Sequence, residues 1–163
     1  MEVLQKETGE TKLRWLKMLM KEAIKRAKEK EEIKRIIERG GFFCSGYVTL
    51  ESGEKIKKWN LGFYDPSTHK ITSVLVTENS VKIGISGTSL RKNIRNPDEN
   101  KIRVKGEEAL EKAKREFERY GKPLSKILIS FQKREKEFWN ISFITKFGSI
   151  INIRIDSKNG DII

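Results

Sequence analysis

Apolar residues along the chain follow two spacings, one typical of amphipathic helices and one typical of strands. Helical spacing runs from Ala109 to Tyr120, and a helical stripe that drifts around its axis runs over residues 10–39. The charged run at residues 28–32 interrupts that stripe and predicts a kink there. Gly121 and Pro123 are typical of a helix end. Apolar, β-branched runs predict strands at 42–50, 56–64, 71–76 and 81–85, and again at 124–131, 138–144 and 149–156.

Two motifs occur twice, in the same order. Residues 22–28 resemble residues 108–114, and the Trp-Asn-x-x-Phe motif at 59–63 recurs at 139–143. A repeat of this kind predicts an α+β fold of two tandem units, each a helix packed on an antiparallel sheet of three to four strands. We expect a first unit at 1–86 with an extended N-terminal helix, a basic connector at 87–104 and a second unit at 105–163.

The same patterns predict the core, with the two repeated tryptophans as buried anchors rather than ligand-stacking groups. In the N-terminal half the expected core residues are Leu16, Met20, Ile24, Ala27, Ile37, Phe43, Trp59, Leu61, Phe63, Val74 and Val76. In the C-terminal half they are Leu110, Ala113, Phe117, Ile127, Ile129, Trp139, Ile141, Phe143, Ile151, Ile153 and Ile155.

The Glu-Ala-aliphatic motif, together with the terminal stretch at 153–162, resembles the PepSY family of small cystatin-like modules. The similarity covers residues 105–163 over the length of one module, and residues 22–24 and 56–83 in the first half. It implies a non-catalytic module that binds a protein or peptide, whose identity the sequence does not give. The family offers no catalytic residues to transfer.

Composition limits the remaining classes of protein. The 163 residues contain 35 Lys and Arg against 23 Asp and Glu, a formal net charge of +12, with one Cys and one His. One cysteine excludes an internal disulfide framework and a zinc cluster, and no run is apolar enough for a transmembrane segment. No apolar signal core begins the sequence, so a cytoplasmic protein is expected. Abundant Lys, Glu and Ile with few Gln residues is thermophile-like.

Candidate catalytic chemistry is sparse. His69 lies in an expected hairpin turn, where a solvated turn residue is the favoured interpretation, and Cys44 lies within an expected strand as a small buried residue. Residues 156–161 resemble a calcium loop, but Lys158 stands where an oxygen ligand is needed. We therefore expect no enzyme, no cofactor and no metal.

RNA binding is the alternative function. The connector is the densest basic stretch, with candidate phosphate contacts at Arg91, Lys92, Arg95, Lys101 and Arg103. Ile83-Gly84-Ile85-Ser86-Gly87 just before it resembles the Gly-x-x-Gly loop of a KH domain, although no basic residue stands between the glycines.

The N-terminal helix is a third candidate surface, because its apolar residues exceed what one sheet face can cover. Trp15, Met18 and Leu19 point away from the main stripe and are candidate docking residues for a protein or a membrane surface. Packing between the two halves, or across a homodimer, is the favoured explanation.

Overall fold

The computed structural model describes residues 18–163, which form three α-helices, one 3₁₀ helix and seven strands. Each expected strand overlaps an observed one, and the broad α+β class is confirmed. In chain order the elements are α3 (Met20–Lys28), α4 (Glu31–Glu38), β1 (Phe42–Glu51), β2 (Lys58–Asp65), β3 (Lys70–Thr77), β4 (Val81–Thr88), η1 (Glu99–Lys101), α5 (Gly106–Glu118), β5 (Leu124–Lys133), β6 (Glu137–Thr145) and β7 (Ile150–Asp156).

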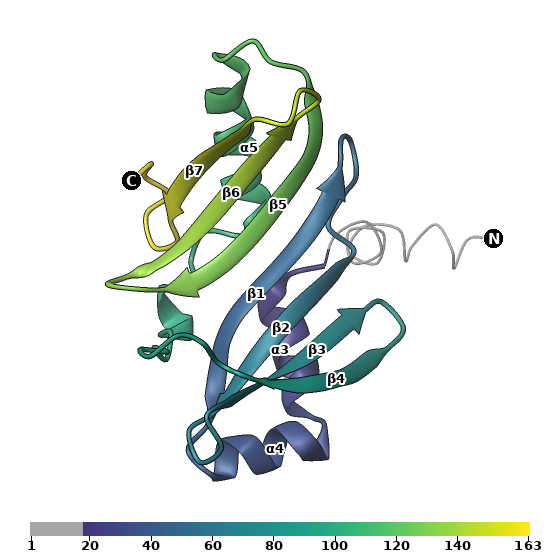
Figure 1. Ribbon diagram of the computed structural model, residues 1–163, viewed down its shortest axis with the longest axis vertical. Helices are drawn as coiled ribbons and strands as arrows, with labels where there is room; N and C mark the ends of the chain where they lie inside the picture. The colour runs from purple at the N-terminus through teal and green to yellow at the C-terminus, as the bar shows by residue number, and fades with distance from the viewer. Residues whose placement is uncertain (1–17) are drawn as a thin grey trace, which may run out of the picture.

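All seven strands belong to one antiparallel sheet, in the order β4-β3-β2-β1-β5-β6-β7. The prediction of two tandem units, each a helix on its own sheet, is therefore wrong. β1 pairs with β5 from Ser45↔Gln132 to Glu51↔Lys126, and Figure 1 shows these two strands side by side in the middle of the sheet. An apolar pattern locates strands and their buried faces, but it does not say which strand edges pair.

Apolar side chains meet across the β1–β5 junction. Val48 lies opposite Ile129 and both are fully buried. The rings of Phe43 and Phe131 stack there, with their centroids 6.0 Å apart. The junction therefore joins the two halves through side chains as well as through backbone hydrogen bonds, and a single apolar cluster extends across it.

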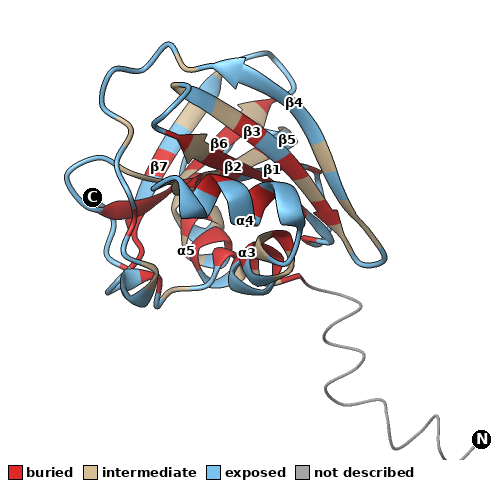
Figure 2. Cartoon of the chain, turned by 90° about the horizontal axis from the view of Figure 1, so that it is seen from below, coloured by how far each residue is buried: buried red, intermediate tan, exposed pale blue. Residues whose placement is uncertain are grey.

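The helices all lie on one face of the sheet, as Figure 2 shows. α3 packs under β2 and β3, α4 packs under β2, and α5 packs under β6 and β7. The expected core is largely confirmed. Buried as predicted are Met20, Ile24, Ala27, Phe43, Trp59, Leu61, Phe63, Val74, Val76, Leu110, Ala113, Phe117, Ile127, Ile129, Trp139, Ile141, Phe143, Ile153 and Ile155. Ile151 is half-buried, and Leu16 lies outside the described residues.

The predicted kink in the N-terminal helix is confirmed, because α3 ends at Lys28 and α4 begins at Glu31. The break changes the direction of the chain, so the buried face of α4 carries Ile33 and Ile36. Ile37, expected in the core, is 38% exposed because it follows these two on the outer side of a short helix.

Trp59 and Trp139 are confirmed as core anchors and have closely similar surroundings. Both are fully buried, and their ring centroids are 5.8 Å apart. The indole N–H of Trp59 donates to the Met18 carbonyl at 2.8 Å, just before α3. The indole N–H of Trp139 donates to the Val104 carbonyl at 2.9 Å, just before α5. Each tryptophan thus fixes the backbone from which a helix begins.

The continuous core leads to a prediction about cooperativity. We expect Ile129→Ala to reduce the free energy of unfolding by about 2–5 kcal/mol, because it leaves a cavity in the β1–β5 junction. Wild type and variant should each unfold in one transition that coincides by far-UV circular dichroism and tryptophan fluorescence. Two separate transitions in the wild-type protein would contradict a shared core.

Candidate functional site

β4 is an outer strand of the sheet, and no element of the described chain pairs with its far side. It lies at the edge of the sheet in Figure 1. Its residues from Gly84 to Thr88 are exposed, and Lys82 is its only charged residue. Among the described large apolar residues, the most exposed are Leu90 at 99% and Ile85 at 92%, one on β4 and one just beyond it. The edge strands of protein sheets are usually protected by charges, prolines or covering segments. Because the described chain places none of these along most of β4, this edge is open to a further strand.

The opposite edge of the sheet is partly covered by the chain itself. After β7 the chain turns back, and Ile162 forms an isolated bridge with Ile155. The amide of Asp156 donates to the Asp161 carbonyl at 2.8 Å, and the amide of Ile163 donates to the Arg154 carbonyl at 2.9 Å. The last three residues of β7 are therefore paired, whereas the whole outer side of β4 is not.

The Gly84–Gly87 stretch lies within β4 and forms no loop of the KH kind. A register shift in the β3–β4 pairing falls opposite it, between Thr72 and Val74. A Cβ on Gly84 would lie 3.3 Å from the Ser73 carbonyl oxygen, so close approach to β3 explains this glycine. The hydroxyls of Thr72 and Ser86 also bond across the two strands at 2.7 Å.

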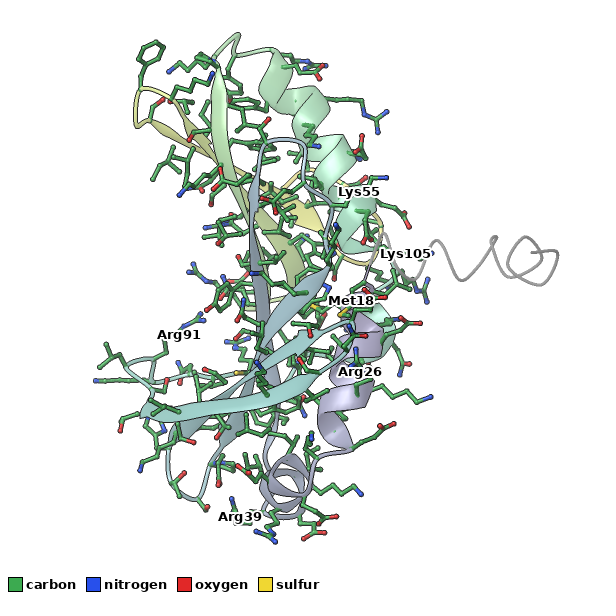
Figure 3. The ribbon with its side chains drawn as sticks, turned by 90° about the vertical axis from the view of Figure 1, so that its right-hand side faces the viewer. Met18, Arg26, Arg39, Lys55, Arg91 and Lys105 are labelled. Carbon is green, nitrogen blue, oxygen red and sulfur yellow. The ribbon has the colours of Figure 1, made fainter. Side chains whose placement is uncertain are left out.

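The cations of the connector separate into two groups. Arg91 and Arg95 lie beside the β5–β6 hairpin, and Figure 3 shows Arg91 on the sheet face away from the helices. Arg103 lines a hollow at the start of α5. There the amides of Arg103 and Val104 both donate hydrogen bonds to the Ser157 carbonyl. Lys92 and Lys101 are exposed. The five residues that the sequence grouped as phosphate contacts are thus not one surface.

Around Arg91 and Arg95 lies a shallow hollow, which we call the basic hollow, with a volume of about 250 Å³. Its lining residues are Arg91, Asn93, Arg95, Lys133, Arg134 and Glu135. Arg91 donates to the Gln132 side chain at 2.8 Å, and Lys133 pairs with Glu137 at 3.3 Å. Among the described residues, no ion pair within 4 Å involves Arg91, Arg95 or Arg134. The hollow therefore keeps a local excess of positive charge.

Glu137 ties the connector to β6 below the basic hollow. Its carboxylate accepts a hydrogen bond from the Asp98 amide at 3.2 Å and forms an ion pair with the Lys133 ammonium group. Burial raises the pKa of Glu137, but these hydrogen bonds outweigh burial and hold the pKa below its ordinary value. Glu137 is therefore a buried anion that fixes the connector in place.

Tyr47 is an exposed aromatic residue on the open face of the sheet that the sequence did not indicate. It is 49% exposed, while Val48 beside it is buried on the helical face. Ser45, two residues earlier, pairs with Gln132. Because side chains alternate along a strand, Tyr47 and Gln132 lie on the same open face.

The docking surface proposed for the N-terminal helix is only partly described. Trp15 lies outside the described residues. Met18 is 7% exposed, and its amide donates to the Ile56 carbonyl at 2.8 Å. Leu19 is half-buried at the start of α3. Both residues are therefore packed against the fold rather than projecting from it.

Cys44 and His69 have separate partners. Burial raises the pKa of the Cys44 thiol, and the thiol donates to the Gly62 carbonyl at 3.4 Å. His69 Nδ1 lies 2.6 Å from the Tyr64 hydroxyl, in a turn where His69 has a φ of 56°. No hydrogen bond joins the cysteine to the histidine in the described structure, so the two are not arranged as a nucleophile and its base.

Two buried aspartates fasten turns. The Asp65 carboxylate accepts hydrogen bonds from the amide and the hydroxyl of Ser67, and it forms an ion pair with Arg39 at 2.7 Å. The Ser67 hydrogen bonds lower the pKa of Asp65, burial raises it, and Arg39 lowers it further, with a net decrease. Asp156 accepts the Lys158 amide at 2.8 Å within the stretch that resembles a calcium loop. Burial raises the pKa of Asp156, and the hydrogen bonds it accepts reverse that effect.

Metal ligands, membrane-spanning helices and similarity to known proteins give no assignment for this site. Within residues 18–163, no group of three or more His, Cys, Asp or Glu side chains could hold a metal ion. No helix in that part of the chain is both long enough and apolar enough to cross a membrane. Comparison with protein-family models, curated proteins and solved structures finds no match to this chain.

The lowered pKa of Asp65 predicts an acid-dependent contribution to stability. Asp65→Ala should reduce the free energy of unfolding by about 1–3 kcal/mol at pH 7, because Arg39 and Ser67 lose their acceptor. The folded pKa is below the ordinary value of 3.8, so this stabilisation is present above that value and is lost as pH falls through the folded pKa. Urea unfolding at pH 7 and at about pH 3 should show the difference shrinking. Glu118→Ala, on the exposed side of α5, should change neither value, and a pH-independent loss in Asp65→Ala would contradict the ionic origin.

Proposed function

We propose that this protein is a non-catalytic binding protein that takes up an extended peptide segment as an additional strand along β4. The observation that supports this function is the outer side of β4, which no described element pairs with, whereas the opposite edge at β7 is partly covered. An extended peptide gains backbone hydrogen bonds from such an edge and gains specificity from side chains on alternate positions. The partner is therefore a protein segment that is extended or becomes extended on binding.

The side chains around β4 suit this role. Glycines at 84 and 87 leave the backbone of the strand accessible to a second chain, and a Cβ at Gly87 would meet no atom within 4 Å. Ile85 and Leu90 are almost fully exposed and supply apolar contact area. With only Lys82 charged, the edge lacks the repulsion that normally prevents strand addition.

The prediction is that lysines at the edge weaken peptide binding. Peptides that bind the full chain would be selected from a phage-displayed random library. Each peptide would be about twelve residues long, which exceeds an ordinary strand. The dissociation constant of the best peptide, measured by fluorescence anisotropy, should rise by about tenfold or more in the Ile85→Lys/Leu90→Lys variant. On binding, amides of β4 should become protected from hydrogen exchange.

A matched control carries the same change elsewhere. Phe147 and Ile150 are 86% and 61% exposed, at and beside the β6–β7 turn, so Phe147→Lys/Ile150→Lys adds two lysines without altering β4. This variant should bind the peptide like the wild type. Equal weakening in both variants, or the absence of protection at β4, would contradict strand addition. Self-association that depends on Ile85 and Leu90 would instead identify a second copy of the chain as the occupant of the edge.

The basic hollow favours a second candidate function, the binding of single-stranded RNA. Arg91, Arg95 and Arg134 have no acidic partner within 4 Å among the described residues. Tyr47 lies on the same face and is exposed enough to stack on a base. Cations and an aromatic on an open sheet face are the two components of sequence-tolerant binding to single strands.

Salt dependence tests this second function. Binding of labelled oligouridine should weaken steeply with salt in the wild type. Replacing Arg91, Arg95 and Arg134 with Gln should lower the slope of log K against log salt by about 2, since each phosphate contact contributes roughly 0.7. Replacing the exposed Lys30, Lys122 and Lys146 with Gln removes the same charge elsewhere and should leave the slope nearly unchanged. No binding at low salt, or equal slopes in both variants, would eliminate this function.

A further inference from the structure

A second hollow, apart from β4 and the basic hollow, opens between the starts of α3 and α5. We call it the helix-start hollow, and its volume is about 260 Å³. It is lined by Leu19, Met20, Lys21, Ile102, Arg103, Val104, Lys105, Gly106 and Trp139. Figure 3 shows Lys105, which lines it, on the helical side of the molecule, opposite Arg91.

The backbone around this hollow is fixed by the two tryptophans. Their indole N–H groups hold the carbonyls of Met18 and Val104, immediately before the two helices. Gly106 lies against both rings, and a Cβ there would come within 3.2 Å of Trp59 and 3.4 Å of Trp139. Because buried groups hold the backbone at Met18, Val104 and Gly106, the hollow is preformed and does not need a ligand to open it.

The lining combines apolar and positively charged side chains. Leu19 and Val104 supply apolar surface above the buried Ile102 and Trp139. Among the described lining residues, the charged ones are Lys21, Arg103 and Lys105. All three cations are exposed, and none forms an ion pair within 4 Å in the described part of the chain. The beginnings of α3 and α5 add positive partial charge to these formal charges.

We infer that the helix-start hollow binds a small free carboxylate with an apolar body, such as a medium-chain alkanoate. The apolar part packs on the half-buried Leu19 and Val104, and the carboxylate lies at the rim among Lys21, Arg103 and Lys105. At roughly 30 Å³ for each water of liquid volume, the hollow has room for about eight or nine waters, which fits a ligand of about ten non-hydrogen atoms. This site is independent of the peptide-binding function, since none of its residues belongs to β4.

Octanoate is the probe, and 1-octanol is its neutral counterpart. In the full chain labelled with ¹⁵N, octanoate should shift the indole N–H signal of Trp139, which reports on the hydrogen bond to Val104. The Lys21→Gln/Arg103→Gln/Lys105→Gln variant should bind octanoate about tenfold more weakly. In wild type, octanol should bind more weakly than octanoate, and the preference should decrease with salt.

Two further variants keep the test decisive. Lys30→Gln/Lys122→Gln/Lys146→Gln removes three charges elsewhere and should bind octanoate like the wild type. Leu19→Trp fills the hollow from a half-buried position and should abolish the shift of Trp139 while the other signals keep their folded dispersion. Equal binding of octanol and octanoate, equal weakening in both charge variants, or no shift of Trp139 with octanoate would each overturn the inference.

Discussion

The seven residue pairs between β1 and β5 join two halves that would otherwise each expose an unpaired strand. A sheet of three or four strands under one layer of helix buries little apolar surface, and such small folds are marginally stable. Pairing in the middle provides one longer sheet and lets Val48 and Phe43 pack against Ile129 and Phe131. The single core, the position of the helices on one face and the two outer edges all depend on this junction.

Trp59 and Trp139, which lie in the core next to that junction, fix the positions at which α3 and α5 begin. Their rings touch across the middle of the core, and each donates its N–H to the segment that precedes a helix. A buried indole needs such a partner, so the carbonyls of Met18 and Val104 are fixed with it. The two helix starts are thereby held near each other, and the space between them is a direct result of how the tryptophans are satisfied.

Local features could be predicted from the sequence. The strand positions, the break between Lys28 and Glu31 and the burial of both tryptophans depend on periodicity, charge runs and residue type, all of which are local. The pairing of β1 with β5 could not be predicted, since it joins residues about eighty positions apart and no side-chain pattern specifies an edge. The Gly84–Gly87 motif was misleading for a related reason, because a glycine needed for close strand approach looks the same in sequence as one needed in a loop.

Side-chain surfaces were the least predictable part. Arg91 and Arg103 are twelve positions apart in one basic stretch, yet the connector passes from one side of the sheet to the other between them. Arg134 comes from another segment and joins Arg91 only in three dimensions, and Tyr47 lies on the same face of the sheet as Gln132, to which Arg91 donates. Charge density along a chain therefore indicated that a basic surface exists, but not its members.

The unequal edges of the sheet limit how this molecule could assemble. Open-ended fibres need two complementary edges that can repeat without closing. Within residues 18–163 one boundary is unpaired along its length, while residues 161–163 pair with the end of β7 and leave Ile150–Ile153 unpaired on the outer side of the other. A strand added at the free boundary would thus terminate growth, so the architecture favours finite complexes over polymerisation even though one long edge is bare.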